Sequence, residues 1–118
     1  MFKRISVIGL GYIGLPTAAV IASNNIHVVG VDINKYAVDT INQGNIHIVE
    51  PGLQELVKSA VSQGYLKAFT EPQKADAFLM AVPTPFKAKN FEADLKYIES
   101  ASRALAPLLE KGNLVVLE

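Results

Sequence analysis

The sequence predicts an α/β domain in which a doubly wound parallel sheet carries helices on both faces. Three observations predict this fold class. Strand-like apolar segments alternate with helix-like periodic segments along the whole chain of 118 residues. A Gly-x-Gly-x-x-Gly motif at Gly9, Gly11 and Gly14 separates the first apolar segment from the first helix-like one. The second apolar segment then ends on an acidic residue, Asp32.

The first half of the chain predicts two strands and three helices. An apolar run predicts a strand at about 4–9. Pro16 has no N–H and is tolerated only in the first turn of a helix, so it places the next helix at about 13–24. A second apolar run predicts a strand at about 27–32. Apolar residues at helical spacing predict further helices at about 35–43 and 52–63.

The second half of the chain continues the alternation. Short apolar runs predict strands at about 66–69 and 76–82, and a longer periodic segment predicts a helix at about 94–110. The terminal Leu-Val-Val-Leu run predicts a buried last strand at about 113–118. Right-handed crossovers between parallel strands then give a Rossmann-like sheet with the strand order 3-2-1-4-5. We expect one domain, residues 1–118, truncated after the fifth strand of a longer protein.

The glycine motif has a physical role at each position. Gly9 makes the tight turn after the strand, and Gly14 lets the helix lie close to it. Gly11 has no Cβ, so a pyrophosphate can approach the backbone. The helix N-terminus offers unpaired N–H groups and positive dipole charge, and we expect the N–H groups of Gly11, Tyr12 and Ile13 to hold the phosphates. Glycines alone also fit an ordinary turn, but the preceding strand and the later acid favour cofactor binding.

Asp32 predicts which dinucleotide binds. It lies about 20 residues beyond the glycine motif, where a carboxylate accepts hydrogen bonds from the adenosine ribose hydroxyls and repels a 2′-phosphate. The arginine that would accommodate that phosphate is missing from the residues that follow, although Lys35 could partly offset the repulsion. The sequence therefore predicts NAD as the cofactor.

Other candidate residues follow the fourth strand and the second helix. Thr84 stands between two prolines at the carboxyl end of the fourth strand, where ligands of such sheets bind, although the prolines could serve only to stop the strand. Glu50 could face a substrate, but a carboxylate before a helix more often acts as an electrostatic cap. His27 and His47 have no Asp, Ser or Cys at a telling spacing, so we expect structural positions for both.

The composition excludes several classes of protein and site. Eleven Lys and Arg cancel eleven Asp and Glu, and no basic stripe is present, so we expect neither a nucleic acid nor a membrane surface as a partner. The absence of cysteine excludes disulfides, thiolate metal sites and a cysteine nucleophile within these residues. No signal peptide or apolar run of membrane length is present, and we expect the cytoplasm as the compartment.

Five segments of the chain resemble one family. They are residues 9–16, 30–33, 50–53, 82–85 and 115–118, and together they resemble the NAD-binding amino-terminal domain of the UDP-glucose/GDP-mannose dehydrogenase family. Residues 46–51 and 81–87 are most similar to the members that act on UDP-N-acetyl-D-mannosamine. The resemblance extends over essentially the whole chain.

The resemblance implies a function and a division of labour. It implies that two NAD molecules in turn take hydride from C6 of a nucleotide sugar to give a uronic acid, which supplies surface polysaccharides. Tyr12 and Ile13 would contact the cofactor, Asp32 its adenosine ribose and Thr84 its far side. The cysteine nucleophile of the family and its lysine, asparagine and aspartate partners lie in a later domain, so this chain has no catalytic residue and is expected to be inactive alone.

Two alternatives and two further expectations remain beside this interpretation. The chain could be the cofactor domain of another two-domain dehydrogenase, of the hydroxyacyl-CoA or phosphogluconate type. It could also be a stand-alone nucleotide-binding module. We further expect that the longer enzyme forms a homo-oligomer, and that the isolated domain self-associates through the unpaired edge of its last strand.

Overall fold

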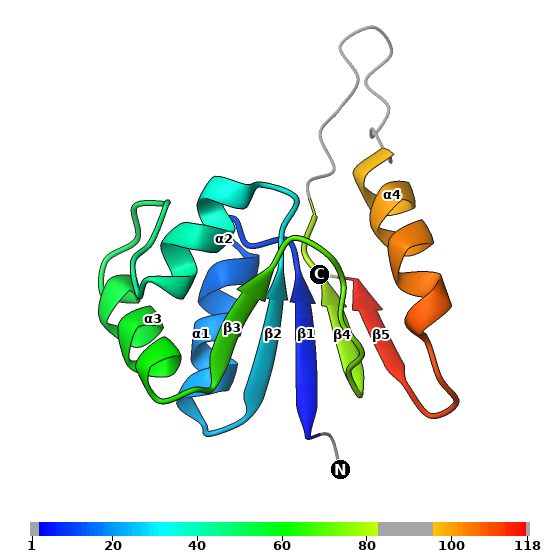
Figure 1. The fold of residues 1–118 in the computed structure, drawn as a ribbon, viewed down its shortest axis with the longest axis horizontal. Helices are drawn as coiled ribbons and strands as arrows, with labels where there is room; N and C mark the ends of the chain where they lie inside the picture. The colour runs from blue at the N-terminus through cyan, green and yellow to red at the C-terminus, as the bar shows by residue number, and fades with distance from the viewer. Residues whose placement is uncertain (1–2, 83–95, 118) are drawn as a thin grey trace, which may run out of the picture.

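A five-stranded sheet forms the centre of the computed structural model, which describes residues 3–82 and 96–117. All neighbouring strands are parallel, and their order β3-β2-β1-β4-β5 confirms the predicted one (Figure 1). The strands are β1 Arg4–Ile8, β2 His27–Val31, β3 Leu66–Phe69, β4 Ala77–Met80 and β5 Leu114–Leu117.

The helices divide between the two faces of the sheet. Val7 and Val28 belong to one cluster of buried side chains, together with residues of the first three helices. Their sequence neighbours Ile8 and Val29 belong to a second cluster with Leu105 of the last helix. Because side chains alternate along a strand, the two clusters lie on opposite faces. The helices are α1 Gly14–Ser23, α2 Lys35–Asn42, α3 Leu53–Ser62 and α4 Lys96–Leu105.

The last helix is shorter than predicted. Residues 94 and 95 lie outside the described part of the chain, and α4 ends at Leu105 instead of continuing to residue 110. A short 3₁₀ helix, Ala106–Leu108, follows it and contains Pro107. Pro107 cannot donate the N–H that an α-helix needs at this position, and the apolar periodicity that predicts a longer helix does not reflect this.

The two edges of the sheet differ. At the β3 edge, the side chain of Asn42 donates to the carbonyl of Ala68 (2.9 Å) and accepts the Ala68 N–H (2.8 Å). At the β5 edge, the expectation of a buried strand is wrong. Leu114, Val115, Val116 and Leu117 are 37–58% exposed, because β5 pairs only with β4 among the described strands.

Asp76, directly before β4, joins three strands at the amino-terminal end of the sheet. Its carboxylate accepts the N–H groups of Lys3 (2.8 Å) and Arg4 (2.9 Å), and its carbonyl accepts the Leu114 N–H (3.2 Å). The N–H groups of Arg4 and Lys3 lower the pKa of the Asp76 carboxyl, because they favour its ionised form. Within residues 3–82 and 96–117, none of the helices has the length and apolar character of a membrane span.

Candidate cofactor site

The glycine loop lies at the carboxyl end of β1, between β2 and β4. This is the point where the strand order reverses and where ligands of doubly wound sheets bind. Gly9 has a φ of +96°, which L side chains rarely adopt, and its N–H donates to the carbonyl of Val31 at 2.7 Å. A Cβ on Gly9 would lie 2.5 Å from the carbonyl oxygen of Ala81, at the end of β4. The tight turn and the neighbouring strand therefore both require glycine here.

Gly14 and Gly11 differ sharply in their surroundings. A Cβ on Gly14 would lie 1.6 Å from the carbonyl oxygen of Gly9, so only glycine lets α1 start this close to the turn. A Cβ on Gly11 would meet nothing within 4 Å. Pro16 is the third residue of α1, in the first turn, as predicted. The loop thus leaves open space beside Gly11 at the start of a helix.

The start of α1 presents unused donors. Among the described residues, no backbone acceptor pairs with the N–H groups of Gly11, Tyr12, Ile13 or Gly14, whereas the Leu15 N–H already donates to the Gly11 carbonyl at 3.1 Å. Tyr12 and Ile13 are 64% and 61% exposed. Free N–H groups at the positive end of a helix suit an anion such as a diphosphate.

Asp32 follows β2 directly and is half-buried. One carboxylate oxygen accepts the N–H of Leu10 at 2.9 Å, and the other accepts the N–H of Asn34, also at 2.9 Å. The carboxylate therefore ties the glycine loop to the start of α2. Each carboxylate oxygen can accept a second hydrogen bond, so both retain capacity for ribose hydroxyls. Residue spacing does not indicate these two contacts with backbone N–H groups.

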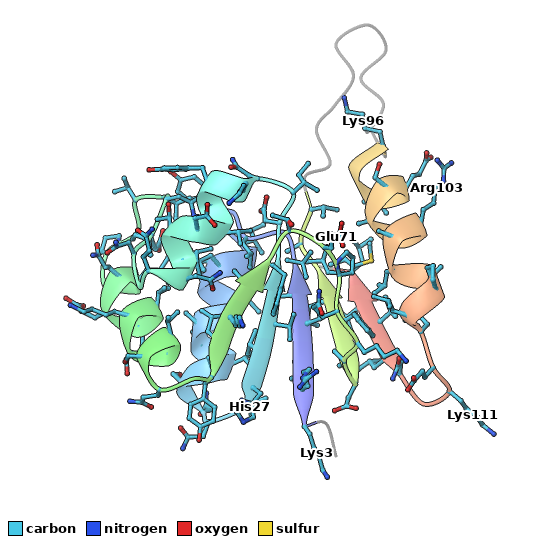
Figure 2. The ribbon with its side chains drawn as sticks, viewed as in Figure 1. Lys3, His27, Glu71, Lys96, Arg103 and Lys111 are labelled. Carbon is cyan, nitrogen blue, oxygen red and sulfur yellow. The ribbon has the colours of Figure 1, made fainter. Side chains whose placement is uncertain are left out.

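A cavity of about 250 Å³ opens beside Asp32. Residues at the ends of four strands line it, and α4 forms another wall; Figure 2 shows Glu71 at this end of the sheet, opposite the end that carries Lys3 and His27. Its apolar walls and the carboxylate at its side suit a nucleoside. The lining residues are Ile8, Gly9, Val31, Asp32, Ile33, Thr70, Glu71, Pro72, Val82, Ser100, Ala101 and Ala104.

Most of these lining residues were not singled out from the sequence. One signal in the sequence is an apolar residue directly after the acid, Ile33, whose side chain is 86% exposed in the structure. The small side chains of Ser100, Ala101 and Ala104 were another, because their spacing puts them on one helix face.

Other candidate residues lie apart from the cavity or outside the described part. Thr84 belongs to the residues that the structure does not describe. The Lys35 ammonium pairs with Asp39 at 2.8 Å. Glu50 is exposed before the start of α3, and its carbonyl accepts the Leu53 N–H at 3.2 Å. Its role as an electrostatic cap stays a prediction.

The two histidines lie at the positions that follow. The His27 ring packs on Tyr65 with centroids 4.9 Å apart, and His47 lies in the segment between α2 and α3. Within the described ranges, no cluster of three or more His, Asp or Glu side chains could hold a metal ion.

Comparison with known proteins identifies the family to which this chain belongs. Residues 3–118 match the UDP-glucose/GDP-mannose dehydrogenase family, NAD binding domain. The chain belongs to this family. NAD is therefore its cofactor, and the alternatives of the hydroxyacyl-CoA and phosphogluconate types are set aside.

Individual relatives within the family are similar over nearly the whole chain. An NDP-N-acetyl-D-galactosaminuronic acid dehydrogenase of Ralstonia nicotianae is 68% identical over 117 residues, which is 99% of this chain and 27% of that protein. A UDP-N-acetyl-D-mannosamine dehydrogenase of Campylobacter jejuni is 64% identical over 117 residues, 99% of this chain and 29% of that protein. The chain thus spans little more than a quarter of these relatives.

A solved structure in the family supports the same fold. The UDP-N-acetyl-mannosamine dehydrogenase of Staphylococcus aureus superposes with a TM-score of 0.94 at 41% sequence identity, over 98% of this chain and 28% of that one.

Proposed function

We propose that this chain binds NAD through the glycine loop and Asp32. Gly9 and Gly14 shape the loop, Gly11 leaves room for the pyrophosphate, and the N–H groups from Gly11 to Ile13 hold it. The observation that carries this proposal is the open space at Gly11, next to donors that lack a backbone acceptor among the described residues. Asp32 takes the adenosine ribose, and the adjoining cavity takes the adenine. Thr84 is proposed to contact the far side of the cofactor.

The proposed substrate of the longer enzyme is UDP-N-acetyl-D-mannosamine, oxidised at C6 to the uronate with two NAD per sugar. The Campylobacter jejuni and Staphylococcus aureus relatives named for this sugar support the proposal. A second candidate is an NDP-linked N-acetylgalactosamine, because the Ralstonia nicotianae relative has the higher identity. Both candidates are 2-acetamido sugars on a nucleoside diphosphate.

Bound NAD supplies the hydride acceptor for such an oxidation. The role proposed for this chain is to fix the position of the cofactor, and the nucleophile and general base of the reaction are proposed to lie outside it. The isolated chain should therefore bind NAD without turnover. We place the reaction in the cytoplasm, where NAD and nucleotide sugars are available.

Absorbance assays of NADH formation can test both which sugar is oxidised and whether the isolated chain has activity. The full-length protein that contains this chain should form about two NADH per UDP-N-acetyl-D-mannosamine consumed, and the isolated chain should form none. UDP-N-acetyl-D-galactosamine, tested in parallel, discriminates the second candidate. Steady NADH formation by the purified isolated chain would contradict the proposed separation of binding from chemistry.

A further inference from the structure

We propose that Gly30, in the middle of β2, is a positioning residue for the glycine loop. Its missing side chain makes room for Leu10, and Leu10 in turn fixes the backbone from which the phosphate-binding N–H groups project. This inference rests on the proposed function, because it assigns a role in holding NAD to a residue that does not itself touch the cofactor cavity.

Backbone conformation does not explain a glycine at this position. Gly30 lies inside a regular strand, paired with Val7 on one side and Ala68 on the other. It is not among the glycines with positive φ. Glycine weakens a strand interior, and a close approach by another group is a common reason for it to occur there.

The close approach at Gly30 comes from Leu10. A Cβ at Gly30 would lie 3.0 Å from Cδ1 and 3.1 Å from Cδ2 of Leu10, closer than ordinary carbon contacts of about 3.5–4.0 Å. Leu10 is fully buried in the cluster that also holds residues of α1 and α3. An alanine at position 30 would therefore push Leu10 against a closed core.

Two hydrogen bonds donated by backbone N–H groups transmit that displacement to the loop. The Gly9 N–H donates to the Val31 carbonyl at 2.7 Å, and the Leu10 N–H donates to the Asp32 carboxylate at 2.9 Å. The turn is thus held by Val31 and Asp32, the two residues that follow Gly30 in the chain. Shifting Leu10 would strain these bonds and move Gly11, the next residue. Neither Gly30 nor Leu10 lines the cavity, so the effect on NAD would be indirect.

NAD titration of four proteins tests the proposal: the wild-type chain, Gly30→Ala, Leu10→Val and the double variant. Gly30→Ala should weaken NAD binding at least about tenfold. The NAD affinity of the double variant should lie within about threefold of that of Leu10→Val. Valine lacks the two Cδ atoms that the alanine Cβ would meet, whereas the distance of 3.6 Å from that Cβ to the Leu10 Cγ is an ordinary contact. Val28→Ile, which adds a methylene on the same face of β2, should lower stability but leave NAD affinity unchanged.

A second measurement, made without NAD, separates this inference from the proposed function. The backbone amide of residue 10 should exchange hydrogen faster in Gly30→Ala than in the wild type, and should recover its protection in the double variant, where residue 10 is valine. If the wild-type chain fails to bind NAD, the proposed function fails while this amide test still applies. Unchanged Leu10 protection and wild-type NAD affinity in a folded Gly30→Ala variant would overturn the inference. If Gly30→Ala does not fold, recovery of folding and of amide protection at residue 10 in the double variant supports the inference, and their absence overturns it.

Discussion

At the scale of single residues, the three glycines of the loop are glycine for different reasons. Gly9 needs its positive φ, and Gly14 needs to avoid the Gly9 carbonyl. Neither reason applies to Gly11, since a Cβ there would contact no atom within 4 Å. A requirement for glycine at this position would therefore come from the bound cofactor, which makes Gly11 the most selective probe of binding.

Gly11→Val should abolish measurable NAD binding while leaving the unfolding temperature close to that of the wild type. The branched side chain would occupy the space proposed for the pyrophosphate without meeting protein atoms. Calorimetric titration and thermal unfolding measure the two effects. Gly14→Ala is the contrasting variant and should lose folding as well, because its Cβ would collide with backbone. Unchanged NAD affinity in Gly11→Val would show that the phosphates bind at another place in the molecule.

The wild-type chain should bind NAD at least about tenfold more tightly than NADP, because a 2′-phosphate beside Asp32 costs roughly 1–4 kcal/mol in like-charge repulsion. Asp32→Asn should weaken NAD binding and improve NADP binding. It should also cost about 1 kcal/mol of stability, since an amide cannot accept the N–H groups of both Leu10 and Asn34 through two oxygens. Titration of both cofactors at one ionic strength measures the preference.

Lys35→Ala serves as the matched control for that experiment. The Lys35 ammonium pairs with Asp39, so its removal should change neither affinity substantially. Equal affinity of the wild type for NAD and NADP would show that Asp32 does not face the ribose.

The stability of the fold should depend on pH through the Asp76 carboxyl. Its pKa is lowered in the folded state, so its stabilising effect is present above its unfolded pKa of about 4 and is lost as the pH falls through the lower folded value. Asp76→Asn should be less stable at neutral pH and lose less stability on acidification. Denaturant unfolding between neutral and acidic pH measures this. Asp39→Asn, at an exposed ion pair, is the control, and parallel pH profiles for wild type and Asp76→Asn would refute the assignment.

The sequence indicates the glycines and Asp32 as candidate site residues, but it does not indicate their contacts. The glycines and Asp32 carry a recognisable spacing, because a phosphate and a ribose constrain residue type at fixed positions. The hydrogen bonds of Asp32 to Leu10 and Asn34, and the contact between Gly30 and Leu10, depend on where two loops meet in space. Residue spacing alone does not determine such contacts.

At the scale of elements, Asn42 connects the end of α2 to the β3 edge. Asn42→Ala should lower the free energy of unfolding by about 1–2 kcal/mol, because two hydrogen bonds to the Ala68 backbone are lost. Chemical denaturation measures the loss. Asn45→Ala, which removes one exposed 3.3 Å contact with Gln54, should have a much smaller effect. Equal stability of the two variants would mean that water replaces the Asn42 amide at no cost.

Element order was predictable, and element ends were less so. The alternation of strand-like and helix-like segments located all five strands, and right-handed crossovers between them gave the correct strand order. The predicted helix over 94–110 failed at Pro107, which acts locally against a favourable periodic pattern. The predicted burial of β5 failed because apolar composition indicates what a strand prefers, whereas exposure depends on its neighbours.

At the scale of the whole molecule, the β5 edge should make the isolated chain self-associate. The edge is apolar and exposed, and Leu114–Leu117 contains neither charge nor proline to discourage pairing with a second copy. Sedimentation velocity should show mass rising with concentration. Val116→Lys should restore a monomer, since a charge on an edge strand opposes such pairing. A wild-type chain that stays monodisperse and heat-resistant at all concentrations would refute this expectation.

The central position of β1 has a consequence for how the chain acquires its shape during synthesis. β1 leaves the ribosome before the other four strands of this sheet, yet it pairs with β2 on one side and with β4 on the other. Until residues 77–80 emerge, one side of this apolar strand has no partner, and the clamp from Asp76 to Lys3 and Arg4 cannot form. The nascent chain therefore passes through a stage with an exposed central strand, in which chaperone binding or a translational pause would have its greatest effect.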